Sequence, residues 1–211
     1  MCGIVGYIGS KRATDILVGG LKRLEYRGYD SAGLAILHEG ELKLRKVLGK
    51  LRVMEQSVEE EPIEGTVGIG HTRWATHGRP SVRNAHPHTD SSGRIALVHN
   101  GIIENYVELK TELQAEGVEF VSDTDTEVIA HLVGKYYKGD IAAAVREACA
   151  RLEGAYAIAV VCRDEPDRLV AARLFSPLIV GLGDGENFIG SDIPAILDRT
   201  RDVYILDDGD M

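Results

Sequence analysis

The order of the hydrophobic patterns along this chain limits the folds that are open to it. Short apolar or alternating runs occupy both ends of the sequence, and amphipathic helical patterns lie between them. Strands that precede and follow a block of helices favour an α+β fold, whereas a parallel sheet needs strands and helices to alternate. The 211 residues therefore predict one domain, residues 1–211, in which helices cover antiparallel sheets.

Strands are expected where apolar residues run together or alternate with polar ones. The ranges are 3–9, 33–37, 41–47, 66–71, 94–99, 155–162, 169–172, 178–182, 187–189 and 203–206. Apolar residues at helical spacing predict a helix from about residue 14 to near residue 28, two central helices over 128–136 and 141–152, and a short one at 193–197. Asp125 or Thr126, and Asp140, are candidate N-caps of the central helices.

Composition excludes several classes of function. The net charge of −9 argues against a nucleic-acid partner. No apolar run approaches the roughly 20 residues that span a bilayer, and no basic segment precedes the apolar N-terminal stretch as in a signal peptide. The three cysteines have unrelated spacings, which predict neither a disulfide framework nor a zinc motif. A reduced, cytoplasmic protein is expected.

Cys2 has two readings, a small core hydrophobe or a nucleophile. Removal of Met1 is favoured before a small side chain and would leave a thiol and a free α-amine on one residue. An α-amine titrates near ~7.7–8.0 and can accept the thiol proton directly or through one water. Position two therefore makes Cys2 a candidate nucleophile without a separate histidine.

Three further segments each allow a structural or a functional role. His99-Asn100-Gly101 ends a predicted strand and is either a turn or an oxyanion hole built from the Asn100 amide and the Gly101 N–H. In the segment 71–78, Arg73 is either an exposed loop residue or a clamp for a carboxylate, with Trp74 as a mobile lid. The segment 122–127 is either a helix N-terminus or the source of an aspartate for a ligand ammonium.

The histidines between residues 71 and 99 raise the question of a metal site. Ala85-His86-Pro87-His88 matches no helical zinc motif, and no Cys or Glu spacing completes one. The glycines at 181–185 lack the spacing of a phosphate-binding loop. Neither a metal nor a cofactor is therefore expected.

Four motifs in this order resemble the class II glutamine amidotransferases, a family of N-terminal nucleophile hydrolases. They are Cys2-Gly3-Ile4-Val5-Gly6, the run from Leu24 to Gly33, the run from His71 to Gly78, and His99-Asn100-Gly101. The residues of these motifs are most similar to those of the glutaminase domain of glucosamine-6-phosphate synthases. The resemblance covers the chain from Cys2 to about Asp210. In amidophosphoribosyltransferases a Gln usually replaces Tyr29, and asparagine synthetases lack the Trp-Ala-Thr-His loop.

The resemblance implies a four-layer αββα sandwich and a role for each residue. It implies Cys2 as the nucleophile, Asn100 and Gly101 as the oxyanion hole, and Asp125 as the partner of the glutamine ammonium. It also implies Arg73 as the carboxylate clamp and Trp74 as the lid. Thr76 and His77 would line the same loop, and Arg27 would orient the nucleophile.

The resemblance also implies partners and leaves alternatives. L-glutamine would be hydrolysed to glutamate and ammonia. A full-length relative would add sugar-isomerase domains, which this chain lacks, to pass the ammonia to fructose 6-phosphate, and would form any oligomer. The alternatives are a glutamine-binding regulatory module without turnover, the glutaminase domain of another class II amidotransferase, and a metal-dependent hydrolase built on the histidines.

Overall fold

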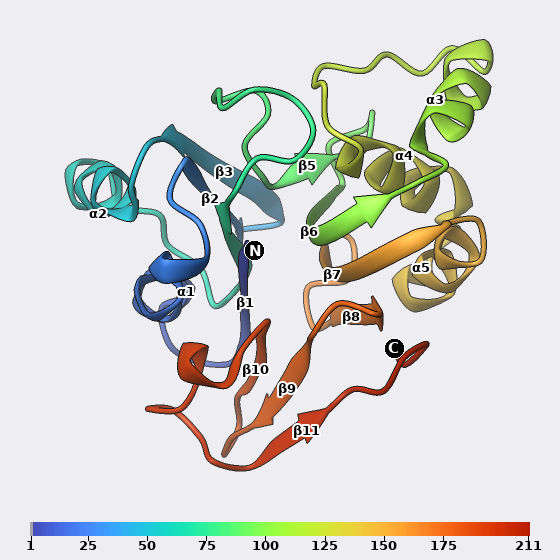
Figure 1. Ribbon diagram of the computed structural model, residues 1–211. Coiled ribbons are helices and arrows are strands. Elements are labelled where there is room, and N and C mark those ends of the chain that lie inside the picture. The colour runs from blue at the N-terminus through green and yellow to red at the C-terminus, as the bar shows by residue number, and fades with distance from the viewer. Residues whose placement is uncertain (1) are drawn as a thin grey trace.

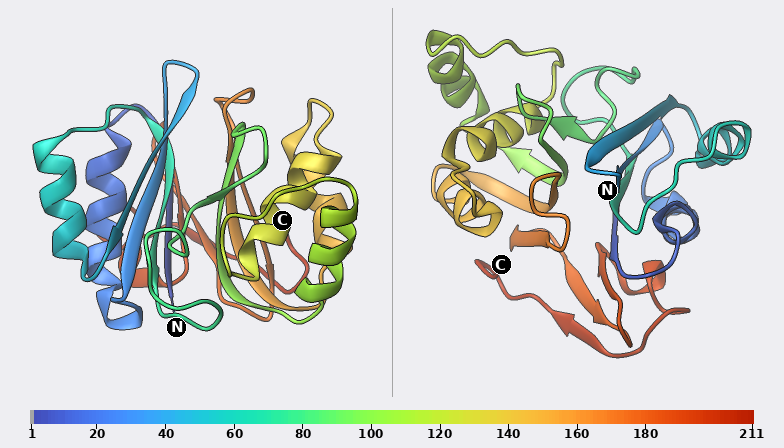
Figure 2. Two further views of the ribbon diagram at one scale, coloured as in Figure 1. Left: turned by 90° about the horizontal axis from the view of Figure 1, so that it is seen from above. Right: turned by 180° about the vertical axis from the view of Figure 1, so that it is seen from behind.

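The computed structural model describes residues 2–211 and contains two antiparallel sheets that pack face to face (Figures 1 and 2). The seven-stranded sheet has the order β11-β9-β10-β1-β4-β2-β3. Its strands are β1 (Gly3–Ile8), β2 (Ser31–His38), β3 (Glu41–Leu48), β4 (Val67–Arg73), β9 (Ile179–Leu182), β10 (Asn187–Gly190) and β11 (Val203–Ile205). The four-stranded sheet has the order β5-β6-β7-β8, with β5 (His88–Thr89), β6 (Ile95–Ile103), β7 (Gly154–Cys162) and β8 (Leu169–Leu174).

Helices cover the outer face of each sheet and complete four layers (Figure 2). Helices α1 (Ala13–Arg23) and α2 (Leu51–Glu60) lie on the seven-stranded sheet, and a 3₁₀ turn, η1 (Glu25–Arg27), follows α1. Helices α4 (Thr126–Tyr136) and α5 (Ile141–Cys149) lie on the four-stranded sheet, with α3 (Tyr106–Ala115) beside α4. A second 3₁₀ turn, η2, spans Ile193–Ala195. The predicted α+β αββα sandwich is confirmed.

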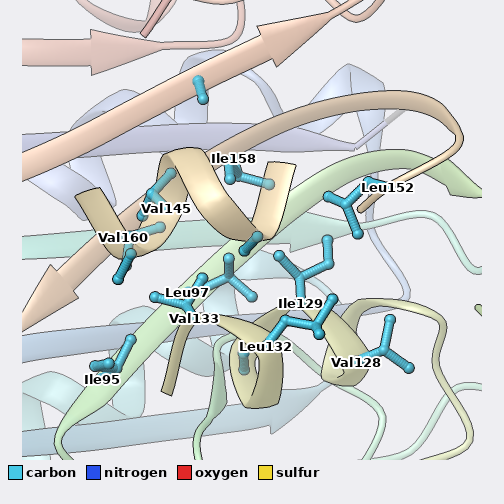
Figure 3. Close-up of a cluster of buried hydrophobic side chains, with 14 of the residues drawn as sticks. Ile95, Leu97, Val128, Ile129, Leu132, Val133, Val145, Leu152, Ile158 and Val160 are labelled. Atoms are coloured by element: carbon cyan, nitrogen blue, oxygen red, sulfur yellow. The ribbon is translucent and has the colours of Figure 1, made fainter. Parts of the chain in front are cut away.

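Three hydrophobic clusters hold the four layers together. One lies between the sheets, where small residues such as Ala96, Ala157 and Ala159 let the two backbones approach closely. A second joins α1 and α2 to the seven-stranded sheet. The third, drawn in Figure 3, packs Val128, Leu132 and other apolar residues of α4 and α5 against β6 and β7. Burial on both faces explains why the central strands read as continuous apolar runs.

Several predicted elements differ from the structure at their ends. The first helix ends at Arg23 rather than near residue 28, and η1 fills the interval because Leu24 leaves the helical conformation. Asp140 caps α5 by accepting hydrogen bonds from two backbone N–H groups. Asp125 occupies the predicted N-cap position of α4 but makes no side-chain capping hydrogen bond, since its carboxylate accepts the Ile103 N–H instead.

Helices α2 and α3 were not predicted. The buried positions of α2, Leu51, Met54 and Val58, follow helical spacing and could have identified it. Helix α3 buries only Leu109 and Leu113, so its sequence carries a weak periodic signal. Within residues 2–211, no helix is long and apolar enough to cross a membrane.

Candidate active site

A cavity of about 450 Å³ opens where the N-terminal end of β1 faces β6 and the start of α4. Asn100 of β6 hydrogen-bonds the backbone of Cys2, so the two sheets meet directly at this cavity. Most of the residues implicated by sequence line it: Cys2, Arg27, Arg73, Trp74, Thr76, Asn100, Gly101 and Asp125. A cavity of this volume is of the size that takes a small molecule.

Cys2 is partly buried, and its sulfur lies against the backbone of Trp74. The Trp74 N–H donates to Cys2 Sγ at 3.1 Å, and the thiol donates to the Trp74 carbonyl at 3.4 Å. Burial raises the pKa of the Cys2 thiol, and the Trp74 hydrogen bond opposes this shift. The thiol is therefore protonated at neutral pH, and a nucleophilic role requires a base.

The carbonyl of Cys2 is held from two sides. Asn100 Nδ2 donates to it at 3.0 Å and Arg27 Nε donates at 3.1 Å. Arg27 is itself buried in η1 and ion-pairs with Asp192 at 2.9 Å. Because a carboxamide nitrogen carries two hydrogens, Asn100 can hold the Cys2 backbone with one and direct the other into the cavity.

Gly101 lines the cavity beside Asn100, and its conformation requires glycine. Its φ is +130°, a backbone region that residues with a side chain rarely adopt. A Cβ at this position would lie 2.0 Å from the Ala155 carbonyl oxygen of the neighbouring strand. Only glycine at position 101 therefore allows the backbone of β6 to take this path beside the cavity.

Arg73 is buried, which corrects the sequence-based expectation of an exposed loop arginine. It is the last residue of β4 and only 3% exposed, because its side chain turns inward between the sheets. Nη2 donates to the carbonyls of His77 and Gly78. Nη1 is buried, lies at the cavity and has no hydrogen-bond partner among the described residues. That unsatisfied donor is suited to an anionic ligand.

The loop after Arg73 forms the rim of the cavity. Trp74 is 48% exposed and packs edge-on against Tyr29, with ring centroids 5.4 Å apart. The base of the loop is fixed because Asp30 accepts the Ala75 N–H at 2.5 Å. Thr76 is exposed and lines the cavity. His77 lies outside the lining and packs against Tyr106.

Asp125 supplies a buried carboxylate directly before α4. Its Oδ2 accepts the Ile103 N–H at 2.9 Å, which fixes the carboxylate to the end of β6. Its Oδ1 is 4.0 Å from His77 Nδ1. Arg73 and Asp125 thus give one cavity a cationic and an anionic group, which together match the two charges of an α-amino acid.

The family described as "Glutamine amidotransferase domain" matches residues 71–198, more than half of the chain. The chain belongs to this family. Among curated relatives, the glutamine–fructose-6-phosphate aminotransferase (isomerizing) of Caldanaerobacter subterraneus subsp. tengcongensis is 63% identical over 99% of this chain and 34% of its own length. The protein of the same name from Thermus thermophilus is 58% identical over 100% of this chain and 35% of its own. The amidotransferase chain thus spans about a third of these relatives.

Solved structures show the same fold. The glutamine phosphoribosylpyrophosphate amidotransferase of B. subtilis, solved with ADP and GMP, superposes with a TM-score of 0.83 at 27% identity. The match covers 97% of this chain and 44% of that one. A structure described as the allosteric regulatory enzyme of purine biosynthesis gives a TM-score of 0.82 at 29% identity, over 92% of this chain and 43% of that one. Both are larger proteins in which this fold is one part.

Sequence reasoning did not assign several residues that line the amidotransferase cavity. They are His86, His99, Ile102, Glu104, Thr124, Thr126, Ala155, Ser176 and Pro177. The histidines were noticed only as possible metal ligands, and within residues 2–211 no group of three His, Cys, Asp or Glu side chains is arranged to hold a metal ion. Ser176 and Pro177 come from the segment after β8 and carry no motif.

Proposed function

We propose that this domain hydrolyses L-glutamine to L-glutamate and ammonia through a thioester on Cys2. The observation that carries the proposal is that one cavity holds a thiol, a buried arginine with a free donor, a buried aspartate and a carboxamide. Arg73 Nη1 would bind the α-carboxylate of glutamine, and Asp125 Oδ1 the α-ammonium. The side-chain amide of the substrate then extends toward Cys2 and Asn100.

The chemistry begins with transfer of the Cys2 thiol proton to the free α-amine of the same residue. The thiolate attacks the carboxamide carbon, a C–S bond forms, and the oxygen becomes an oxyanion. The second N–H of Asn100 and the Gly101 N–H stabilise that charge. The C–N bond then breaks, and the nitrogen takes the proton from the α-ammonium and leaves as ammonia. Water cleaves the thioester, which returns glutamate and the thiol.

The α-amine exists only if Met1 has been removed, and Met1 lies outside the residues that the structure describes. A retained Met1 would convert the Cys2 nitrogen into an amide, which is no base. The chain would then be a regulatory module that binds glutamine without turnover. The two states differ by the mass of one methionine.

Other residues of the rim would control access and position. Trp74, whose side chain is half exposed on the loop at the rim, would cover bound glutamine and exclude water. Thr76 would contact the ligand from the same loop, and His77 would support Asp125 and accept the Arg73 hydrogen bond through its carbonyl. Arg27 would orient the nucleophile, since it holds the Cys2 carbonyl.

The likeness to isomerizing aminotransferases suggests the destination of the ammonia. In a full-length protein of that type, we propose that sugar-isomerase domains outside residues 1–211 receive it and use it to aminate fructose 6-phosphate. Any oligomer would form through those domains. We place the protein in the cytoplasm, and the unpaired state of Cys2, Cys149 and Cys162 is compatible with a reducing compartment.

The proposal is tested by measuring ammonia and glutamate release together with the intact mass of the chain. The wild-type protein lacking Met1 should release both products in equal amounts. Cys2→Ala should abolish release, whereas the matched control Cys149→Ala, which alters a cysteine packed beside the α4–α5 cluster, should keep it. Turnover by Cys2→Ala would overturn the mechanism. Thermal stabilisation by glutamine without turnover by the processed wild type would support the binding-module alternative.

A further inference from the structure

A layer of buried histidines lies directly beneath Asn100. His71 of β4 stacks on His86 with ring centroids 4.2 Å apart, and His86 meets His88 edge-on at 4.8 Å. His99 of β6 is also buried. The proposed reaction uses none of these side chains, although they occupy the space between the two sheets.

The hydrogen bonds of His71 determine where its proton lies. His71 Nε2 is 3.1 Å from the His99 carbonyl oxygen and 3.0 Å from Asn100 Oδ1. A backbone carbonyl can only accept, so Nε2 must carry the proton. The Nε2 proton is therefore shared between two acceptors. An unprotonated Nε2 would instead direct its lone pair at the lone pairs of the His99 carbonyl oxygen, which is unfavourable.

A protonated Nε2 also decides how the Asn100 carboxamide is turned. The oxygen and nitrogen of an asparagine amide are distinguished by their hydrogen-bonding partners. Because Nε2 donates, the nearer atom of Asn100 is the oxygen. The amide nitrogen then points the other way, toward the Cys2 carbonyl at 3.0 Å and the cavity. The opposite turn would place an oxygen where the reaction develops negative charge.

The surroundings of His71 keep the imidazole neutral. Burial is the main cause that lowers the pKa of His71, to about 3, and the positive charge of Arg73 contributes in the same direction. His71 Nδ1 is buried without a hydrogen-bond partner among the described residues, so a second proton there would lack an acceptor. The stacked His86 also has a pKa well below the usual range, chiefly because of burial.

We propose that neutral His71, with its proton on Nε2, is a positioning residue that fixes the Asn100 carboxamide with its N–H groups toward the nucleophile. His71 touches neither the substrate nor the reacting atoms, and it acts through Asn100. The predicted effect on turnover rests on the proposed glutaminase function, whereas the predicted tautomer does not. The two can therefore fail separately.

The kinetic test compares two substitutions at one position. His71→Leu removes the donor and should lower kcat for glutamine hydrolysis by 10-fold or more with little change in KM. His71→Gln places an amide N–H near the position of Nε2 and should recover most of kcat. His88→Leu is the matched control, since it removes a buried imidazole that bonds Thr124 rather than Asn100. It should lower Tm as much as His71→Leu while keeping kcat within about twofold.

Two kinetic outcomes would overturn the proposal. One is a His71→Leu protein that is folded and turns over at the wild-type rate. The other is an equal loss of kcat in His71→Leu and His71→Gln, which would show that the shape of the imidazole matters and not its donor. If even the processed wild-type protein shows no turnover, the proposed function fails, and the tautomer is decided by the spectroscopic test alone.

The spectroscopic test uses the full chain with ¹⁵N-labelled histidine at neutral pH. The His71 resonance, assigned by its loss in His71→Gln, should show Nε2 protonated and Nδ1 unprotonated. This pattern should persist to about pH 5, below the ordinary titration range of histidine. A proton on Nδ1, or an imidazolium at neutral pH, would overturn the proposal whatever the enzyme activity.

Discussion

The two walls of the cavity hold their side chains in different ways. The first wall consists of Cys2, Arg73 and the loop 74–78, all carried by the seven-stranded sheet. Its members contact one another through backbone atoms of the loop, whose Trp74 is 48% exposed. The second wall consists of Asn100, Gly101 and Asp125, carried by β6 and the start of α4. The Asn100 and Asp125 side chains are buried and hydrogen-bond the buried His71 imidazole and the Ile103 N–H, respectively.

This difference suggests that the two walls affect different kinetic parameters. A wall tied to an exposed loop can open for a ligand and close over it, so it should govern mainly how tightly glutamine is held. A wall set in the interior is already arranged before the ligand arrives, and electrostatic stabilisation of a transition state depends on such preorganisation. Changes at Asn100 in the second wall should therefore act mainly on kcat, and changes at Arg73 and the loop of the first wall mainly on KM, whereas loss of the proposed nucleophile Cys2 should remove turnover altogether.

Among changes that keep the proposed nucleophile, the largest effect is expected at Asn100 in the second wall. Asn100→Ala should lower kcat by about 10²–10³, or roughly 3–4 kcal/mol, because one donor of the proposed oxyanion hole is lost. It also releases one of the two hydrogen bonds on the Cys2 carbonyl, while Arg27 keeps the other. Steady-state glutamate release should show KM nearly unchanged. A raised KM with wild-type kcat would contradict the division between the walls.

A smaller effect, on KM, is expected at Arg73 in the first wall. Arg73→Lys keeps a charge but loses the planar fork, so KM for glutamine should rise by about 10-fold with kcat nearly unchanged. Arg73→Ala should raise KM further and also lower Tm, since the carbonyls of His77 and Gly78 lose their donor. Kinetics and thermal unfolding measured on both variants separate the two contributions. A variant impaired only in kcat would place Arg73 with the second wall.

The sequence predicted which residues lie together better than how they are supported. Cys2, Arg73, Asn100 and Asp125 lie in short motifs whose residue types supply a thiol, a cation, an amide and an anion, and all four line one cavity. The burial of Arg73 was missed because a polar segment after a strand reads as a loop, whereas the structure turns that side chain inward. Whether Arg73 faces water depends on what the second sheet covers, and the residue pattern of β4 alone does not contain that information.

The histidine layer was missed for a related reason. His71 and Asn100 are 29 positions apart, and their contact exists only because β4 and β6 face each other across the sandwich. The α+β class was predictable from the order of the strand and helix patterns, whereas the four-layer arrangement was expected only from the resemblance to the class II glutamine amidotransferases. Helix α3 was not, because it presents only two buried residues to the core.

The same layer should make the fold sensitive to acid. Burial lowers the pKa of His71, His86, His88 and His99. Below about pH 6.5 the unfolded chain binds protons that the folded chain does not, so the free energy of unfolding should fall as pH falls. Each histidine contributes a slope of up to about 1.4 kcal/mol per pH unit between its unfolded and folded pKa, and for His71 this window is about pH 6.5 to 3.

Urea unfolding at several pH values measures this slope. His71→Leu removes one titrating group and should be less stable than the wild type at pH 7 but lose less stability between pH 6 and pH 4. Equal slopes in the two proteins would mean that His71 is already protonated in the fold. Such a result would also contradict the inference that neutral His71 holds Asn100 of the second wall in place before glutamine binds.

The smallest effect is expected in the layer behind the second wall. Asp140 caps α5 by accepting from the N–H groups of Ala142 and Ala143, and it also pairs with Arg168 at 3.0 Å. Asp140→Ala should lower Tm by about 2–4 °C, whereas Asp140→Asn retains a cap and should lose less, because exposed ion pairs contribute little. Neither should change kcat or KM, because the α4–α5 cluster separates the cap from the cavity. A loss of kcat in Asp140→Ala alone would show that the second wall depends on the outer helices and is less rigid than its buried hydrogen bonds imply.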